Sequence, residues 1–381
     1  MTSIKADGRT SRHFEAIDSL RGVCAILVVL FHFPVDSLIY SLPVVRHGWM
    51  FVDFFFVLSG FVMAHTYAQR LAQRSVNLRG FMLLRFGRIY PLHVFMLAVL
   101  VSMETFRFVA GLGGRELFDE GRSIPAIFTH LALLHSMGIH AVTTWNGVSW
   151  SIAAEMWAYL LFAAIFRLFP RHATFIMLAA GAACFAVLLA FSPRGLDATY
   201  DYGFARGIMG FAAGVGSYAA FRAGARMGST VSELAIIAAA VVGASYLHEG
   251  PSAFLMLPLF ALAMLVFSSQ RGMVSRMLLM PLPRFLGQIS YSIYMTHPLI
   301  LFVAFELIKR VGTRHGFTFA EHGHITAPPL AGELVTIMML VAVVALARLT
   351  YRAVEVPARD WVRHAGERLR LVPLPGPAAS A

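Results

Sequence analysis

Ten stretches of the chain are apolar and long enough to form membrane-spanning helices. One bilayer crossing takes about 20 mainly apolar residues. The stretches that fit centre on residues 18–36, 49–68, 90–111, 150–169, 173–191, 205–223, 232–248, 251–268, 289–309 and 331–352. A weaker stretch, 124–140, is expected to be re-entrant or interfacial, so the count is ten or eleven. The pattern predicts an all-α polytopic membrane protein, a bundle of about ten transmembrane helices.

The composition supports this fold class. Hydrophobic residues make up 58% of 381 positions, charged residues 13%, and the mean hydropathy is +0.70, which is outside the range of soluble globular chains. Cys24 and Cys184 both lie in apolar stretches, so we expect neither a disulfide framework nor a metal site. We predict one membrane domain over 14–360, with flexible cytoplasmic ends at 1–13 and 361–381.

The distribution of basic residues predicts the orientation of the bundle. With the N-terminus in the cytoplasm, 22 of the 31 Lys and Arg residues fall on the cytoplasmic side, as the positive-inside rule requires. An even number of spans then puts both termini in the cytoplasm. The net charge of +11 is mostly this topology signal, and no nucleic-acid partner is expected, because no basic run is interleaved with stacking aromatics. The first apolar stretch ends without a small-residue cleavage site and contains Arg21, so we expect a retained helix rather than a removed signal peptide.

Arg21 and His32 lie eleven positions apart in the first span. Eleven steps of about 100° return to within roughly 20° of the start, so both side chains share one helix face about 16 Å apart. An ionisable residue inside a membrane is a functional-site hypothesis by default. The alternative is that Arg21 anchors the helix at the interface and that His32 is a hydrogen-bonded packing residue.

Opposite helix directions bring further polar residues to a similar depth. The fourth span starts at Trp150, which places Glu155 in the outer half, and Asp53 lies near the outer end of the second span. A carboxylate beside an imidazole can fix its tautomer while the ring takes a proton from a hydroxyl. The same His32–Glu155 pair can also relay protons in a transporter.

Two arginines and a long loop complete the candidate features. Arg85 and Arg88 are neighbours if their stretch is helical, and two guanidinium groups grip phosphates well. As isolated residues they would be ordinary topology anchors. The loop 104–149 is either a lid or acceptor surface or a plain solvated connector.

Six motifs follow one another from residue 17 to residue 357. They are Ile17–Arg21 with His32, Phe54–Phe61, Arg85-x-x-Arg88-Ile-Tyr90-Pro91, Ser149–Glu155, Leu286–Pro298 and Tyr351–Pro357. In these motifs and their order the chain resembles the acyltransferase family 3 integral membrane proteins, whose better-known members O-acetylate lipopolysaccharide O-antigens, exopolysaccharides, lipo-oligosaccharide signals and macrolide sugars. Only about 20 residues follow Trp361, so no fused hydrolase-type extension is expected.

The resemblance implies an acyl-CoA donor, normally acetyl-CoA, and no permanently bound cofactor. His32, Glu155 and Arg21 are then the expected catalytic residues. The donor-binding residues would be Arg85, Arg88, Tyr90, Tyr291 and Tyr294, and those facing the acceptor Asp53, Trp150 and Ser149. Tyr291, Tyr294 and His297 could line the donor channel, but aromatic residues at their helical spacing are more often packing residues.

Two further residue pairs within the matched motifs are typical of structural roles. Ser59-Gly60 is more typical of a small-residue helix contact than of a nucleophile. His297 precedes Pro298, so a bond to the carbonyl that the proline frees is a sufficient explanation for it.

The function predicted from the sequence is a multi-pass O-acyltransferase of the bacterial inner membrane. It would move an acyl group, normally acetyl, from cytoplasmic acyl-CoA to a hydroxyl of a carbohydrate or glycolipid acceptor at the extracytoplasmic side. The alternative is a proton-coupled transporter or flippase of a glycolipid. The ordered motifs favour the enzyme, and the missing internal repeat weakens the transporter. The sequence does not specify the acceptor, the acyl chain length or the oligomeric state.

Overall fold

A computed structural model describes residues 14–111, 119–319, 324–328, 330–369 and 371. The predicted flexible segment 1–13 and most of the predicted tail lie outside these residues. The longer helices are α1 (Glu15–Phe31), α4 (Phe51–Ala72), α5 (Leu78–Val109), α7 (Trp150–Leu168), α8 (Ala173–Phe191), α9 (Gly203–Arg222), α10 (Thr230–Tyr246), α11 (Met256–Phe267), α14 (Ser290–Val311), α15 (Ala331–Thr350) and α16 (Val356–Arg368).

Short elements connect the long helices. They are α2 (Leu38–Ser41), α3 (Pro43–Arg46), α6 (Ile124–Leu131), α12 (Met273–Leu278) and α13 (Pro281–Gln288), the 3₁₀ turns η1 (Gly48–Met50), η2 (Glu120–Arg122), η3 (Gly147–Ser149), η4 (Gly250–Leu255) and η5 (Gly312–His315), and the π-helical turn η7 (Tyr351–Glu355). The strands β1 (Thr318–Phe319) and β2 (Ile325–Thr326) pair antiparallel, with Phe319 opposite Ile325.

The predicted fold class is confirmed. Each of the ten predicted spans coincides with one of the helices α1, α4, α5, α7, α8, α9, α10, α11, α14 and α15. Seven helical stretches among the described residues are long and apolar enough to cross a membrane. The helices α1 and α10 are shorter, with 17 residues each, and α9 has the buried charge of Arg206.

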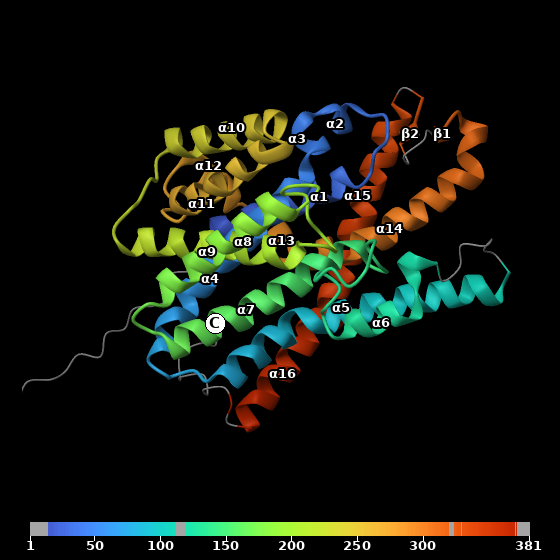
Figure 1. Cartoon of the computed structure of the whole chain (residues 1–381). Helices are drawn as coiled ribbons and strands as arrows, with labels where there is room; N and C mark the ends of the chain where they lie inside the picture. The colour runs from blue at the N-terminus through green and yellow to red at the C-terminus, as the bar shows by residue number, and fades with distance from the viewer. Residues whose placement is uncertain (1–13, 112–118, 320–323, 329, 370, 372–381) are drawn as a thin grey trace, which may run out of the picture.

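The helices α4, α7, α9 and α11 pack around one large apolar core, and α1, α14 and α15 enclose a second core with the small hairpin (Figure 1). The most extensive helix–helix contact joins α4 and α9. A Cβ atom on Gly60 would lie 2.0 Å from the Phe211 carbonyl oxygen, and one on Gly214 would lie 1.9 Å from the Val57 carbonyl oxygen. This confirms that Gly60 serves a small-residue helix contact.

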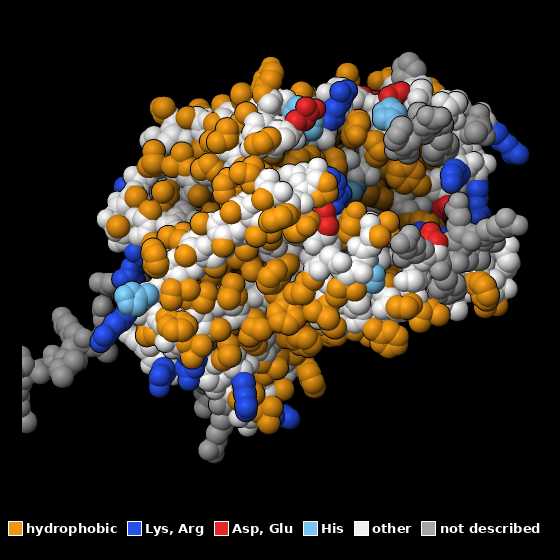
Figure 2. Space-filling model, in the orientation of Figure 1, with side chains coloured by type: hydrophobic (Ala, Val, Ile, Leu, Met, Phe, Trp, Pro, Cys, Tyr) orange, Lys and Arg blue, Asp and Glu red, His pale blue; other side chains and the backbone are white. Residues whose placement is uncertain are grey.

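The outer surface of the bundle is apolar, as a lipid-facing surface requires. On α8, Phe175, Leu189 and Phe191 are all more than half exposed, because only a narrow side of this helix meets its neighbours. Figure 2 shows hydrophobic side chains over most of one face of the molecule, with Lys and Arg side chains toward its ends. Exposed apolar surface of this extent is typical of a protein in a bilayer.

Both described ends of the chain lie at the same end of the bundle. Glu15 at the start of α1 forms an ion pair with Arg284, and Val362 on α16 packs against Gly87 near the start of α5. We call this the arginine end, because Arg21 and Arg88 lie there, and the opposite end the loop end. His32 and residues 119–149 lie at the loop end.

Two helices extend beyond the predicted segments. The helix α5 includes most of the predicted span core 90–111 and begins earlier, at Leu78, where Asn77 caps it by accepting a hydrogen bond from Gly80 N–H. It continues to Val109, so the first residues of the predicted loop 104–149 are helical. Residues 361–368, predicted to be part of a flexible tail, are helical as well, because they belong to α16, which packs along α5.

Candidate active site

A cavity of about 300 Å³ lies between α1, α4, α5, α7 and α14. Three of its lining residues are arginines, namely Arg21, Arg85 and Arg88, which come from two different helices. The stretch that carries Arg85 and Arg88 is helical, and both side chains reach the same cavity. The tertiary fold therefore gathers three cations around one internal space.

Contacts with neighbouring residues hold Arg21 and Arg85 in place. Arg21 Nε donates to Ser290 Oγ at 2.8 Å, its Nη2 donates to the Gly287 carbonyl at 3.0 Å, and Nη1 lies 3.5 Å from the Asp18 carboxylate. Arg85 Nη2 donates to Tyr67 Oη at 3.3 Å, with its guanidinium over the Tyr67 ring. The Nε of Arg85 is buried without a partner among the described residues, so a donor N–H remains for a ligand.

A second hollow, of about 500 Å³, adjoins the cavity at the arginine end. The two spaces share Asp18, Arg21 and Arg88 in their linings. Glu355 lines the second hollow and accepts a hydrogen bond from Ser292 Oγ at 2.9 Å. The cavity therefore continues toward the protein's surface past two of the three arginines.

Glu355 is a site residue that sequence analysis missed. Its motif, Tyr351–Pro357, carried the family resemblance, but no role was assigned to it. In the structure this stretch forms the π-helical turn η7, a rare conformation that occurs frequently at functional sites.

Tyr291 and Tyr294 line the cavity, as predicted for residues on one face of α14. Tyr291 Oη donates to the Ile89 carbonyl. Tyr294 Oη donates to the Val148 carbonyl at 2.9 Å and accepts from Ser151 Oγ at 2.8 Å. The Tyr294 ring also meets the Phe55 ring, with centroids 5.8 Å apart. These two rings line the cavity on the side nearest to His32.

His32 lies just beyond Tyr294, where it contacts His297. The rings of His32 and His297 have centroids 5.0 Å apart, and His297 lies 5.9 Å from the Tyr294 ring. His32 Nδ1 donates to the Val28 carbonyl at 2.8 Å, and His297 Nδ1 donates to the Tyr294 carbonyl at 2.7 Å. In the neutral rings both Nε2 atoms are therefore proton acceptors.

The contact made by His297 confirms the expectation for the residue before Pro298. A proline at position 298 leaves the carbonyl four residues earlier, that of Tyr294, without its helical donor. His297 Nδ1 supplies that donor. Its Nε2, in contrast, is buried and has no partner among the described residues, so the structural explanation accounts for only one of its two nitrogens.

The described contacts do not include the predicted pair of Glu155 and His32. The Glu155 carboxylate accepts from Ser59 Oγ and, at 2.5 Å, from Tyr159 Oη. The depth argument placed Glu155 in the bundle but could not specify which way it faces. Glu155 lines the cavity with Arg85. Ser59 Oγ donates to the Glu155 carboxylate, so of the pair Ser59-Gly60 only the glycine forms the helix contact.

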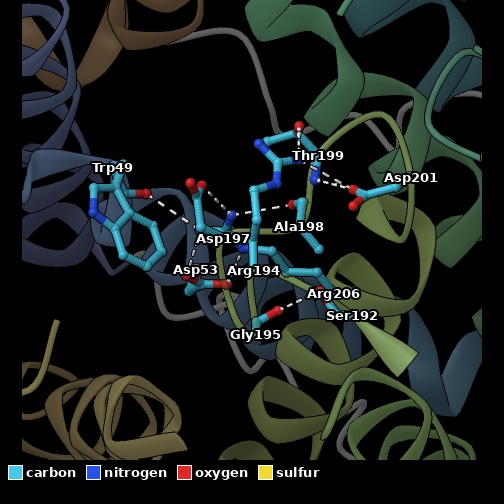
Figure 3. A network of polar contacts seen from close by, with 10 residues as sticks. All are labelled: Trp49, Asp53, Ser192, Arg194, Gly195, Asp197, Ala198, Thr199, Asp201 and Arg206. Carbon is cyan, nitrogen blue, oxygen red and sulfur yellow. Dashed lines mark hydrogen bonds and ion pairs between the residues drawn. The ribbon is translucent and has the colours of Figure 1, made fainter. Parts of the chain in front are cut away.

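Asp53 and Trp150, predicted to face the acceptor, surround Arg206 instead. Arg206 Nε and Nη2 donate to the two Asp53 carboxylate oxygens at 2.9 and 2.8 Å. Its guanidinium lies over the Trp49 ring at 5.2 Å and the Trp150 ring at 5.1 Å. Figure 3 shows Asp53, Asp197 and the Trp49 carbonyl converging on this side chain. Arg206 was not singled out from the sequence, because its partner lies 153 positions away.

Ser149 and Tyr90 also have partners within the protein. Ser149 Oγ donates to the Asn146 carbonyl at 2.7 Å and lies 3.1 Å from His135 Nε2. Tyr90 Oη donates to the Leu131 carbonyl at 2.9 Å, and the residue is absent from the cavity lining. In the described part of the chain, no three His, Cys, Asp or Glu side chains are arranged to hold a metal ion.

The sequence profile of the family described as "Acyltransferase domain" matches residues 14–348. The chain belongs to this acyltransferase family. The family match includes every predicted site residue, whereas Glu355 falls just beyond it. The family membership and the apolar helices together make the chain a multi-pass membrane protein of an acyltransferase family.

Two curated relatives match shorter parts of this family member. It is 33% identical over 126 residues to "Protein 2 in picA locus" of Rhizobium radiobacter, covering 32% of this chain and 64% of that protein. It is 28% identical over 152 residues to "Putative acetyltransferase ORF330" of Acidianus two-tailed virus, covering 40% of this chain and 41% of that protein. The matched parts thus span less than two thirds of either relative. No solved structure matches the chain.

Proposed function

We propose that this membrane acyltransferase transfers an acyl group, normally acetyl, from acyl-CoA to a hydroxyl of a carbohydrate or glycolipid. One observation carries the proposal. A cavity lined by three arginines opens toward the arginine end and reaches Tyr294, next to the His32–His297 pair. A phosphate-bearing donor would bind at one side of this cavity and react at the other.

The arginines suit the phosphates of CoA. Charge-assisted hydrogen bonds from guanidinium groups to phosphate are among the stronger polar contacts in proteins. Along α1, Arg21 and His32 are separated by about 16 Å, a span that the long pantetheine arm would cross. Tyr291 and Tyr294 would line its path, and Glu355 and Asp18 would balance the cationic charge when the site is empty.

The proposed reaction needs one proton acceptor. His32 Nε2 takes the proton from the acceptor hydroxyl while that oxygen attacks the thioester carbonyl carbon. The C–S bond breaks, the acyl group remains on the oxygen as an ester, and the proton leaves with CoA as a thiol. The bond from His32 Nδ1 to Val28 supports this role, because it keeps Nε2 free of a proton.

The proposed location is the inner membrane of a bacterium, with the arginine end in the cytoplasm. Acyl-CoA is a cytoplasmic metabolite, and surface glycans are built and displayed across that membrane. The acceptor would therefore approach from the loop end, where His32 lies.

The decisive experiment measures donor binding and transfer separately in purified protein. His32→Ala is expected to lower the transfer rate by about 10²- to 10⁴-fold, the usual contribution of general base catalysis. Its affinity for CoA, measured by calorimetry, should stay within twofold of wild type. His364→Ala, which changes an exposed histidine of α16, is the control and should alter neither quantity.

Two results would contradict the proposal. If wild-type protein binds no CoA, acyl-CoA is not the donor. If folded His32→Ala protein has wild-type turnover, His32 is not the general base. The acceptor and the acyl group would be identified by comparing the masses of surface glycans from cells with and without this protein.

A further inference from the structure

A third hollow lies at the loop end and is separate from the donor cavity, the space lined by Arg21, Arg85 and Arg88. It has a volume of about 320 Å³ and is formed by the end of α5, the turn η2 and the stretch that leads into α7. Its lining includes Arg107, Asp119, Arg122, Thr143 and Trp145. We propose that this outer hollow binds a sugar unit of the acceptor glycan. The proposal rests on the acyltransferase function proposed above.

The two arginines of the outer hollow are fixed before any ligand binds. Both donate to the carboxylate of Glu104, which is 2% exposed, at 3.3 Å from Arg107 and 3.0 Å from Arg122. Both guanidinium groups also lie over the Phe302 ring, at 5.5 and 5.6 Å from its centroid. Each guanidinium has five N–H donors, so donors remain after the contact with Glu104.

The indole of Trp145 is also held in a defined position. Its backbone has a φ of +44°, which non-glycine residues rarely adopt. Hydrogen bonds at both ends hold it there, from Trp145 N–H to the Gly121 carbonyl at 2.7 Å and from Nε1 to the Ser123 carbonyl at 3.1 Å. Residues kept in such conformations cluster at ligand clamps.

This combination of groups fits a polyhydroxylated ring. Guanidinium donors, the exposed Asp119 carboxylate and the Thr143 hydroxyl can bond to neighbouring sugar hydroxyls. Trp145, whose Nε1 donates to the Ser123 carbonyl, lines the hollow beside these groups. Because Glu104 and Asp119 balance the two arginines in charge, the hollow suits an uncharged sugar as well as a carboxylated one.

The outer hollow is close to the histidine pair. Phe302, under the two arginines, is five residues beyond His297 on α14, which corresponds to about 7.5 Å along the helix. Gly147 lines the hollow, and the adjacent Asn146 Nδ2 donates to the Met295 carbonyl at 3.2 Å. Asn146 Oδ1 and His297 Nε2 are both buried without partners among the described residues. A glycan bound in the outer hollow would therefore lie beside the part of α14 that carries His297.

The test measures occupancy of the outer hollow directly, without relying on turnover. A cysteine is placed at Thr143, inside the hollow, and in a control variant at Ser41, which is exposed on α2 at the same end of the bundle. Intact cells are treated with a membrane-impermeant maleimide, with and without added lipid-linked glycan extract from the same host. The extract should slow labelling of Thr143→Cys at least threefold and leave labelling of Ser41→Cys unchanged.

Two further arms distinguish the possible causes. Phospholipid extract alone should not protect Thr143→Cys; protection by it would overturn the proposal in favour of a lipid headgroup. Arg122→Ala in the Thr143→Cys protein should abolish protection by the glycan extract while CoA affinity stays within twofold of wild type. Equal labelling with and without glycan in protein that binds CoA would overturn the sugar site alone, whereas failure to bind CoA would overturn the donor proposal.

Discussion

The buried charge of Arg206 lies between two indole rings, hydrogen-bonded to the Asp53 carboxylate and 3.7 Å from the Asp197 carboxylate. Arg206 is 1% exposed and Asp53 is completely buried. Their two hydrogen bonds compensate the loss of water around both charges. Because α4 supplies Asp53 and α9 supplies Arg206, this pair joins the same two helices that the glycine contact brings together.

Arg206→Met is expected to destabilise the protein by about 3–5 kcal/mol, because it leaves the Asp53 carboxylate buried without its partner. The double variant Asp53→Leu/Arg206→Met should recover much of that loss, since two apolar side chains often replace a buried ion pair without net cost. Denaturation of purified protein in detergent measures both effects. A double variant no more stable than Arg206→Met would show that the residues act beyond their mutual charge.

Arg85→Ala and Arg88→Ala should each weaken CoA binding by at least tenfold, because each removes a cation from the donor cavity. Arg79→Ala is the matched control. It lies on the same helix, is exposed, and is absent from the lining of either cavity. Calorimetry with CoA measures all three variants. Unchanged affinity in both cavity variants would make these arginines topology anchors only.

The contact between helices α4 and α9 depends on the absence of side chains at two positions. Gly214→Ala is expected to destabilise the protein by about 1–3 kcal/mol, since the added methyl group would meet the backbone of Val57, which cannot move away as a side chain could. Gly216→Ala on the same helix is the control, because its methyl group would meet only the flexible end of Leu178. Thermal unfolding in detergent measures the difference, and equal midpoints for the two variants would contradict it.

Three buried histidines join α5, α6 and the segment before η3. The rings of His130 and His135 are stacked 3.7 Å apart, and His93 lies 5.7 Å from each. Burial, together with the neighbouring His93, lowers the pKa of His135 to about 3 from its usual 6.5. Burial and the adjacent His135 also lower the pKa of His130. His140 lies nearby, bonded to Thr129 at 2.7 Å.

This stack is expected to make the fold sensitive to acid. Below pH 6.5 the unfolded chain binds protons at His130 and His135 that the folded protein does not bind, so stability falls as the pH drops toward 3. The loss reaches about 1.4 kcal/mol per pH unit for each histidine. His135→Gln should reduce this slope, whereas His364→Gln on exposed α16 should not. Unfolding midpoints between pH 4.5 and 7.5 would test this, and identical slopes in wild type and His135→Gln would refute it.

At the scale of the whole molecule, the two ends of the bundle differ in chemistry. The arginine end holds both described chain ends and the donor cavity, and the loop end holds His32 and the outer hollow. We expect Arg79→Cys, at the arginine end, to react with a membrane-impermeant maleimide only after cells are permeabilised. Ser41→Cys should react in intact cells. The opposite pattern would reverse the orientation and leave the fold unchanged.

The sequence by itself determined where the apolar helices lie and the family. The length of an apolar stretch can be read from the local sequence, because each helix in a membrane must satisfy its own backbone hydrogen bonds. Each of the ten apolar stretches could therefore be assigned to a helix, and the contact at Gly60 could be predicted as well. The role of His297 in bonding the carbonyl freed by Pro298 is equally local, and it too was predicted correctly.

Only the tertiary structure decided which polar side chains meet. The depth of a residue along a helix follows from its number, but the direction in which its side chain points depends on how the helix is rotated against its neighbours. For this reason Glu155 pairs with Ser59 and Tyr159 rather than with His32, and Asp53 pairs with Arg206. The outer hollow likewise combines α5, η2 and the stretch before α7. Apart from the bond between Glu155 and Tyr159 on α7, these contacts join residues far apart in the chain, and helix packing brings them together.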